Sequence, residues 1–144
     1  MAPTVHQSTD AQSTDPHHLT IIFIGGGNMA KAIASGLLAN SYPNHHIRVS
    51  EPLPERIAYL YDRYLTLNVL ADNHVVLCGA NPESSPATDV IILAVKPQIL
   101  HPVITDIAPT LHAANLLVIS IAAGIRTEDI LCWAGAKDMA LVRY

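Results

Sequence analysis

The sequence predicts an α/β fold in which helices cover both faces of a parallel β-sheet. Short apolar runs rich in β-branched residues alternate at least four times with stretches of helical periodicity, and this alternation is typical of a doubly wound parallel sheet. The chain has 144 residues, 50% of them hydrophobic. It can therefore form one domain with a sizeable core, but not two domains of ordinary size. Such sheets bind their ligands at the carboxyl ends of the strands.

The first strand is predicted at residues 20–24, a continuous apolar run suited to a buried parallel sheet. Apolar residues then recur every four positions from Met29, interspersed with alanines. This spacing predicts a helix over residues 29–39 that packs close to the sheet. An Asn-Ser-Tyr-Pro-Asn segment ends the helix, and residues 47–50 are predicted as the second strand.

The middle of the chain continues the same alternation. The spacing of Ile, Leu and Tyr predicts a helix over residues 54–64, and a short strand follows at 67–70. A helical turn at 74–78 precedes a loop at 79–86, where Gly, Asn, Pro and Ser cluster. The clearest buried strand is predicted at residues 89–95.

The next helix is predicted over residues 99–107, with one proline near its start and another after its end. Pro102 falls near the first turn, where a missing N–H is tolerated, and Pro109 is expected to end the helix.

The two ends of the chain differ in character. Residues 116–121 are predicted as a buried strand, Thr127 caps a last helix with acidic residues in its first turn, and residues 140–144 begin a sixth strand. Residues 1–19 are polar and repeat Gln-Ser-Thr-Asp. We expect them to form a disordered tail, so that the domain spans residues 20–144.

Composition disfavours several classes of function. The 12 acidic and 8 basic residues give a net charge of −4, which suits neither nucleic acid nor an anionic membrane. No apolar run approaches the ~18 residues of a membrane span. Cys78 and Cys132 lack the spacing of a disulfide framework or a zinc site, and adjacent histidine pairs suit one metal ion poorly. We expect a cytoplasmic protein with free thiols and no metal site.

The most informative segment follows the first predicted strand and opens the first helix. Gly25, Gly27 and Ala30 form a G-x-G-x-x-A motif. Gly25 permits a tight turn, Gly27 lets a pyrophosphate approach the backbone, and Ala30 keeps the helix close to the strand. The N-terminus of the helix supplies N–H groups for phosphate. The motif and its context predict dinucleotide binding; the alternative is an ordinary glycine-rich turn.

A residue that binds the adenosine ribose is expected about 20 residues beyond the glycines. Glu51 could accept hydrogen bonds from the 2′-hydroxyl and so favour NAD, whereas Ser50 with Arg56 could hold the 2′-phosphate of NADP. A third interpretation places Glu55 and Arg56 on a solvated helix face. The sequence leaves these alternatives open.

Three motifs in order resemble pyrroline-5-carboxylate reductase. They are Phe-Ile-Gly-Gly-Gly-Asn-Met-Ala at 23–30, Ala-Val-Lys-Pro-Gln at 94–98 and Ser-Ile-Ala-Ala-Gly at 120–124. The resemblance spans about residues 20–143. It implies a Rossmann-type domain that binds NADP(H), or NAD(H), and a small-molecule imine substrate: members of the family reduce the C=N bond of 1-pyrroline-5-carboxylate to give L-proline.

The resemblance also implies where the cofactor lies. The pyrophosphate would lie over the glycine turn, the adenosine ribose beside Ser50, and the nicotinamide between the two later motifs. Together with Arg56, the predicted cofactor-binding residues are Ile24, Gly25, Gly26, Gly27, Asn28, Met29, Ser50, Asn73, Ala94, Val95, Lys96, Pro97, Ile121, Ala122 and Ala123.

No catalytic residue is assigned. Lys96 follows a buried strand, but a lysine at a strand end more often extends to solvent than serves as an acid. Hydride transfer to an imine chiefly requires that the nicotinamide be positioned against the C=N carbon.

The sequence departs from the family at its end. Family members continue into a second, helical domain that builds the homo-oligomer and much of the substrate site, whereas this chain ends at Tyr144. With that domain missing, we expect an uncovered apolar surface and no activity from the chain alone. The loop at 81–86 also looks longer than usual. The alternatives are a stand-alone dinucleotide-binding module and the domain of a related imine or β-hydroxyacid reductase.

Overall fold

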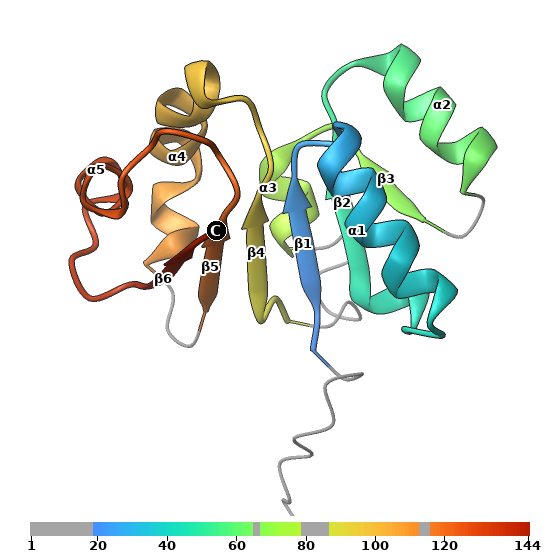
Figure 1. The fold of residues 1–144 in the computed structure, drawn as a ribbon, viewed down its shortest axis with the longest axis horizontal. Helices are drawn as coiled ribbons and strands as arrows, with labels where there is room; N and C mark the ends of the chain where they lie inside the picture. Colours follow the sequence, from blue (N-terminus) through green and yellow to red (C-terminus); the bar gives the residue numbers. More distant parts are fainter. Residues whose placement is uncertain (1–18, 65–66, 79–86, 113–115) are drawn as a thin grey trace, which may run out of the picture.

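A six-stranded parallel β-sheet forms the centre of the molecule (Figure 1). The computed structural model describes residues 19–64, 67–78, 87–112 and 116–144. Most of the predicted tail and the predicted loop at 79–86 lie outside the described residues. The strands follow the order β3-β2-β1-β4-β5-β6, and every neighbouring pair is parallel. The predicted doubly wound fold is confirmed.

The elements lie close to their predicted positions. The strands are β1 (Ile21–Ile24), β2 (Ile47–Ser50), β3 (Asn68–Leu70), β4 (Val90–Leu93), β5 (Leu117–Ser120) and β6 (Ala140–Arg143). The helices are α1 (Asn28–Ala39), the short 3₁₀ helix η2 (Asn44–His46), α2 (Pro54–Arg63), α3 (Asn73–Cys78), α4 (Pro97–Leu111) and α5 (Thr127–Ala134). The chain winds outward from β1 to β3 and then returns to add β4 on the other side of β1. The strand order therefore reverses beside β1, which is where ligands of such sheets bind.

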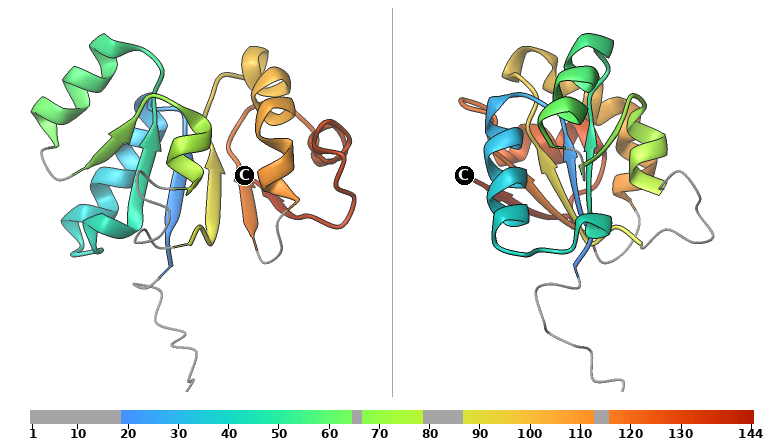
Figure 2. Two further views of the ribbon diagram at one scale, coloured as in Figure 1. Left: turned by 180° about the vertical axis from the view of Figure 1, so that it is seen from behind. Right: turned by 90° about the vertical axis from the view of Figure 1, so that its right-hand side faces the viewer.

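Alternate residues of the strands build two separate cores, one on each face of the sheet. Ile22 and Ile24 of β1 belong to a core that α3, α4 and α5 cover, whereas Phe23 belongs to a core that α1 and α2 cover. Figure 2 shows α1 and α3 on opposite faces. Ala30 and Ala34 of α1 are fully buried, so that the small side chains bring this helix close to the sheet, as predicted.

Helix α4 differs from its prediction, because it begins at Pro97 and continues through Pro109 to Leu111. The prediction that Pro109 ends the helix was wrong, and Pro102 lies in the second turn. An internal proline costs about 3 kcal/mol, but each buried aliphatic side chain contributes about 1.5–3 kcal/mol. Four such residues of α4 face the core: Leu100, Ile104, Ile107 and Leu111. Burial of this face outweighs the proline defects.

Helix α5 also begins differently from the prediction. Its N-cap residue is Arg126, whose side chain caps no described backbone N–H of the first turn, and Thr127 is the first helical residue. The prediction of a Thr127 cap was therefore wrong. Arg126 instead donates to the carboxylate of Asp129 at 3.3 and 3.4 Å, and this hydrogen bond raises the pKa of the Arg126 guanidinium above its ordinary value. The acidic first turn is confirmed.

Two expectations about function classes can be compared with the described part of the chain. Within it, no helix is long and apolar enough to cross a membrane. The same residues contain no group of three or more side chains that could hold a metal ion. Cys78 and Cys132 are free and exposed.

Candidate functional site

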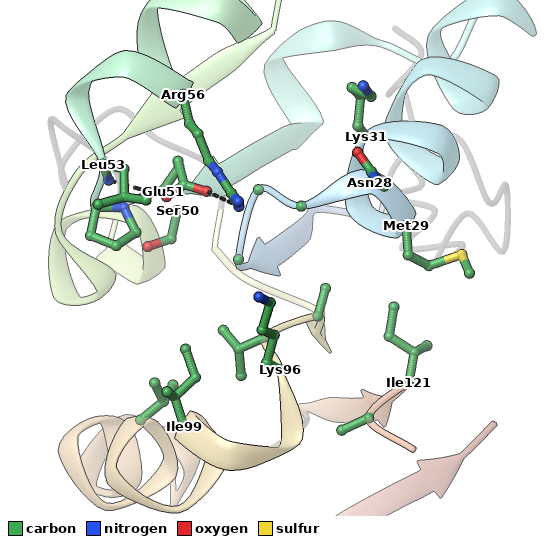
Figure 3. A pocket seen from close by; sticks show the side chains of 18 of the residues that line it. Asn28, Met29, Lys31, Ser50, Glu51, Leu53, Arg56, Lys96, Ile99 and Ile121 are labelled. Carbon is green, nitrogen blue, oxygen red and sulfur yellow. Dashed lines mark hydrogen bonds and ion pairs between the residues drawn. The ribbon is translucent and has the colours of Figure 1, made fainter.

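A cleft of about 930 Å³ lies at the carboxyl ends of the central strands. Its walls come from the glycine turn after β1, the ends of β2, β4 and β5, and the helices α1, α2 and α4 (Figure 3). Every residue predicted to bind the cofactor lines this cleft except Ile24. The side chain of Ile24 is fully buried, and its carbonyl accepts the Ala94 N–H at 2.8 Å. Ile24 thus joins β1 to β4 behind the cleft.

The glycine turn crosses the floor of the cleft. Gly25 has a φ of +106°, and a Cβ added there would lie 2.9 Å from the backbone of Ala94. Gly27 is the N-cap residue of α1, and a Cβ added there would meet no described atom within 4 Å. Gly25 is therefore required by the turn and its close packing on the strand after β4, whereas Gly27 leaves open space.

The N-terminus of α1 opens onto the same space. The structure describes no side-chain cap hydrogen bond and no acidic residue in the first turn of this helix. The first N–H groups of a helix have no partner within the helix and carry partial positive charge. In this arrangement they can bind a phosphate in front of Gly27.

At the end of β2, two predicted residues come together although they lie far apart in the sequence. The buried hydroxyl of Ser50 donates to the side-chain oxygen of Asn73. Asn73 is the first residue of α3, and both residues line the cleft. The sequence predicted each of them separately, and the structure shows that they form one polar group.

Glu51 lies next to this group and is almost completely buried. Its Oε2 accepts the N–H of Leu53 at 3.1 Å, and its Oε1 lies 3.7 Å from Nη1 of Arg56. Arg56 is half-exposed and lines the cleft, whereas Glu55 does not. The interpretation of Arg56 as part of a solvated face is therefore incomplete, since its guanidinium also faces the cleft.

The opposite wall is formed by the segments after β4 and β5. Lys96 is the N-cap residue of α4, and Figure 3 shows Arg56 and Lys96 reaching toward the glycine turn from opposite sides of the cleft. Apolar side chains surround the mouth here, with Met29 58% exposed and Ile99 48% exposed.

Part of the wall comes from residues that the sequence motifs did not indicate. The ammonium group of Lys31 lies 3.4 Å from the hydroxyl of Tyr59 and 5.0 Å from the centre of its ring. This contact joins α1 to α2 across the edge of the cleft. Further lining residues that were not predicted as binding residues are Pro52, Leu53, Leu60, Ala71, Ile99 and Val103, whereas Glu51 was one of the alternatives for the ribose. One signal was available: Tyr59 is an aromatic residue outside the apolar stripe of its helix.

Comparisons with known proteins agree with this geometry. Residues 20–124 match the family described as NADP oxidoreductase, coenzyme F420-dependent. A pyrroline-5-carboxylate reductase from Haemophilus influenzae is 40% identical over 113 residues, which are 78% of this chain and 38% of that protein. The enzyme of the same name from Pisum sativum is 34% identical over 117 residues, or 81% of this chain and 39% of that protein.

Solved structures show the same similarity. A pyrroline-5-carboxylate reductase from Coxiella burnetii has a TM-score of 0.76 and 33% identity, covering 87% of this chain and 43% of that one. The Plasmodium falciparum pyrroline carboxylate reductase, solved with NADP bound, has a TM-score of 0.68 and 24% identity. The similarity covers 88% of this chain and 42% of that one. The predicted resemblance is confirmed, and the chain spans about two fifths of the length of these relatives.

Proposed function

Because the chain belongs to the family described as NADP oxidoreductase, coenzyme F420-dependent, we propose that it binds NAD(P)H as the dinucleotide-binding part of a pyrroline-5-carboxylate reductase. The observation that carries this proposal is the glycine turn. Its Gly27 leaves open space directly in front of the helix N-terminus, and a pyrophosphate needs both features.

The remaining lining residues fit the other parts of a dinucleotide. Ser50, Glu51 and Asn73 present hydroxyl, carboxylate and amide groups at the end of β2, and such groups suit the hydroxyls of a ribose. The segments 94–97 and 121–123 form a mostly small and apolar wall on the other side of the glycine turn. This wall suits the flat face of a nicotinamide ring.

The similar proteins are pyrroline-5-carboxylate reductases, and this activity suggests the reaction of the whole enzyme. We propose that the whole enzyme reduces the C=N bond of 1-pyrroline-5-carboxylate to give L-proline. When bound, NAD(P)H would supply the hydride for this reduction. The residues of this chain fix the orientation of the cofactor: the glycine turn holds the pyrophosphate and the wall at 94–97 and 121–123 supports the nicotinamide. This positioning is the main contribution to hydride transfer. Lys96 adds positive charge near the pyrophosphate and is given no role as an acid.

The proposal extends to the surroundings of the enzyme. We place it in the cytoplasm, as the two free cysteines favour. We expect that the whole enzyme is a homo-oligomer and that it does not bind nucleic acid, since the net charge is −4.

A fluorescence titration tests the proposal. The purified chain is titrated with NADPH and, in parallel, with NADH, and 1-pyrroline-5-carboxylate is then added. We expect a saturable change in the emission of the cofactor, followed by no oxidation, because the chain spans only about two fifths of its relatives. Absence of binding at millimolar cofactor would overturn the proposal. Oxidation after addition of the imine would show that the expectation of inactivity is wrong.

A further inference from the structure

One end of the cleft combines a fixed carboxylate with a movable guanidinium. The side chain of Glu51 is 4% exposed, and the Leu53 N–H holds its Oε2. A Cβ on Gly26 would lie 3.0 Å from Cβ and 3.1 Å from Oε1 of Glu51, so the carboxylate packs tightly against the glycine turn. The side chain of Arg56 is 51% exposed, and its contact with Glu51 is 3.7 Å long. Such a contact holds the guanidinium loosely.

The two groups favour different ligands. A carboxylate that follows the second strand accepts hydrogen bonds from ribose hydroxyls, and an arginine nearby accommodates a 2′-phosphate. The phosphate carries the same sign of charge as Glu51, and repulsion between like charges is strong where water is excluded. The guanidinium of Arg56 can form two parallel hydrogen bonds to a phosphate. It must leave Glu51 to do so.

We propose that Glu51 and Arg56 together determine which dinucleotide binds, through the substituent at the 2′ position of the adenosine ribose. This inference rests on the proposed function, and it assigns opposite roles to the two side chains. Glu51 binds a 2′-hydroxyl and weakens the binding of a 2′-phosphate. Arg56 stays beside Glu51 when the 2′-hydroxyl is bound, and it turns to the 2′-phosphate when one is present. The protein therefore accepts both cofactors, and removal of either side chain makes it selective.

The test compares 5′-AMP with 2′,5′-ADP, which differ only in the 2′-phosphate. Isothermal titration of the full 144-residue chain gives the two dissociation constants and their ratio. Glu51→Gln is expected to change the ratio in favour of 2′,5′-ADP by about tenfold or more, and Arg56→Ala to change it in favour of 5′-AMP by a similar factor. These factors correspond to one charge-assisted hydrogen bond. The ratio of the dissociation constants for NADH and NADPH should change in the same direction in each variant.

Two neighbouring residues provide matched controls. Glu55 and Arg63 are exposed residues of α2 that do not line the cleft. Glu55→Gln and Arg63→Ala change the net charge by the same amounts as the test variants. They should leave the ratio within about twofold of the wild-type value, since surface charges act weakly at a distance.

The outcomes separate this inference from the proposed function. If the wild-type chain binds the probes and neither variant changes the ratio, the inference is overturned while dinucleotide binding stands. If the wild-type chain binds neither the probes nor NADPH and NADH, the proposed function fails and the inference with it. Thermal melting checks that each variant is folded. Should Glu51→Gln unfold, Arg56→Ala decides the question, because its half-exposed side chain contributes little to packing.

Discussion

Gly27→Ala is expected to weaken cofactor binding without harming the fold. Gly27 has φ −73° and ψ −171°, an extended conformation that alanine adopts readily, and an added Cβ would meet no described atom within 4 Å. Alanine is a poorer N-cap residue than glycine by about 0.5–1 kcal/mol. It also lowers the entropy of the unfolded chain, which stabilises the fold by about 0.4–1 kcal/mol. These effects oppose each other, so the free energy of unfolding should change by less than about 1 kcal/mol.

The same methyl group would stand where the pyrophosphate approaches the helix N-terminus. It would lengthen hydrogen bonds between the phosphate and the first N–H groups of α1. A hydrogen bond to a charged group contributes about 1.5–3 kcal/mol, which is about a ten- to hundredfold change in dissociation constant for each bond lost. We therefore expect the dissociation constant of Gly27→Ala for NADPH to rise by at least about tenfold.

Urea unfolding followed by circular dichroism and titration with NADPH measure the two effects on one preparation. Gly36→Ala is the matched control, because Gly36 is an exposed glycine inside α1 with no described atom near an added Cβ. It should stabilise the protein by about 0.5–1 kcal/mol and leave binding unchanged. A folded Gly27→Ala chain that binds NADPH as tightly as the wild type would refute the placement of the pyrophosphate.

Three further alanine substitutions test contacts that hold the strands and helices together, each by urea unfolding. Gly25→Ala should destabilise the protein by about 2–5 kcal/mol, since φ is +106° and the new Cβ would lie 2.9 Å from the backbone of Ala94. Asp89→Ala removes the carboxylate that accepts the N–H of buried Thr20 at 2.9 Å and should cost about 1–3 kcal/mol; Asp89→Asn retains an acceptor and should cost less. Ile104→Ala should cost about 2–5 kcal/mol, because Ile104 is fully buried. A loss below about 0.5 kcal/mol for any of the three alanine variants would contradict the contacts that support it.

The order and type of the elements could be predicted because local patterns determine them. The run at 90–93 is buried on both faces, and a strand with two buried faces has a continuous apolar sequence that is easy to recognise. The end of α4 could not be predicted in this way. Pro109 is a strong local signal for a helix end, but Leu111 is buried against the sheet. Only the tertiary structure shows that this burial is available.

Some lining residues of the cleft could likewise be predicted from the sequence, and others could not. Most of the predicted residues end a strand or follow one closely, and the carboxyl ends of parallel strands meet at one edge of the sheet. Lys31 and Tyr59 instead lie within helices and meet only because α1 and α2 pack on the same face of the sheet. A sequence motif can indicate which residues lie at the ends of parallel strands. The contact between Lys31 and Tyr59 depends on the packing of two helices, which no sequence pattern links.

The choice between NAD and NADP shows why a residue's identity is not enough. In the sequence, Glu51 favours a 2′-hydroxyl and Arg56 favours a 2′-phosphate, and the two signals have equal weight. The structure gives them different freedom, because Glu51 is held by the Leu53 N–H and packed beside Gly26, whereas Arg56 is half-exposed. A fixed charge acts on every ligand that enters, while a mobile charge responds only to a ligand that attracts it. Discrimination at this position therefore depends on burial, which arises only after the chain has folded.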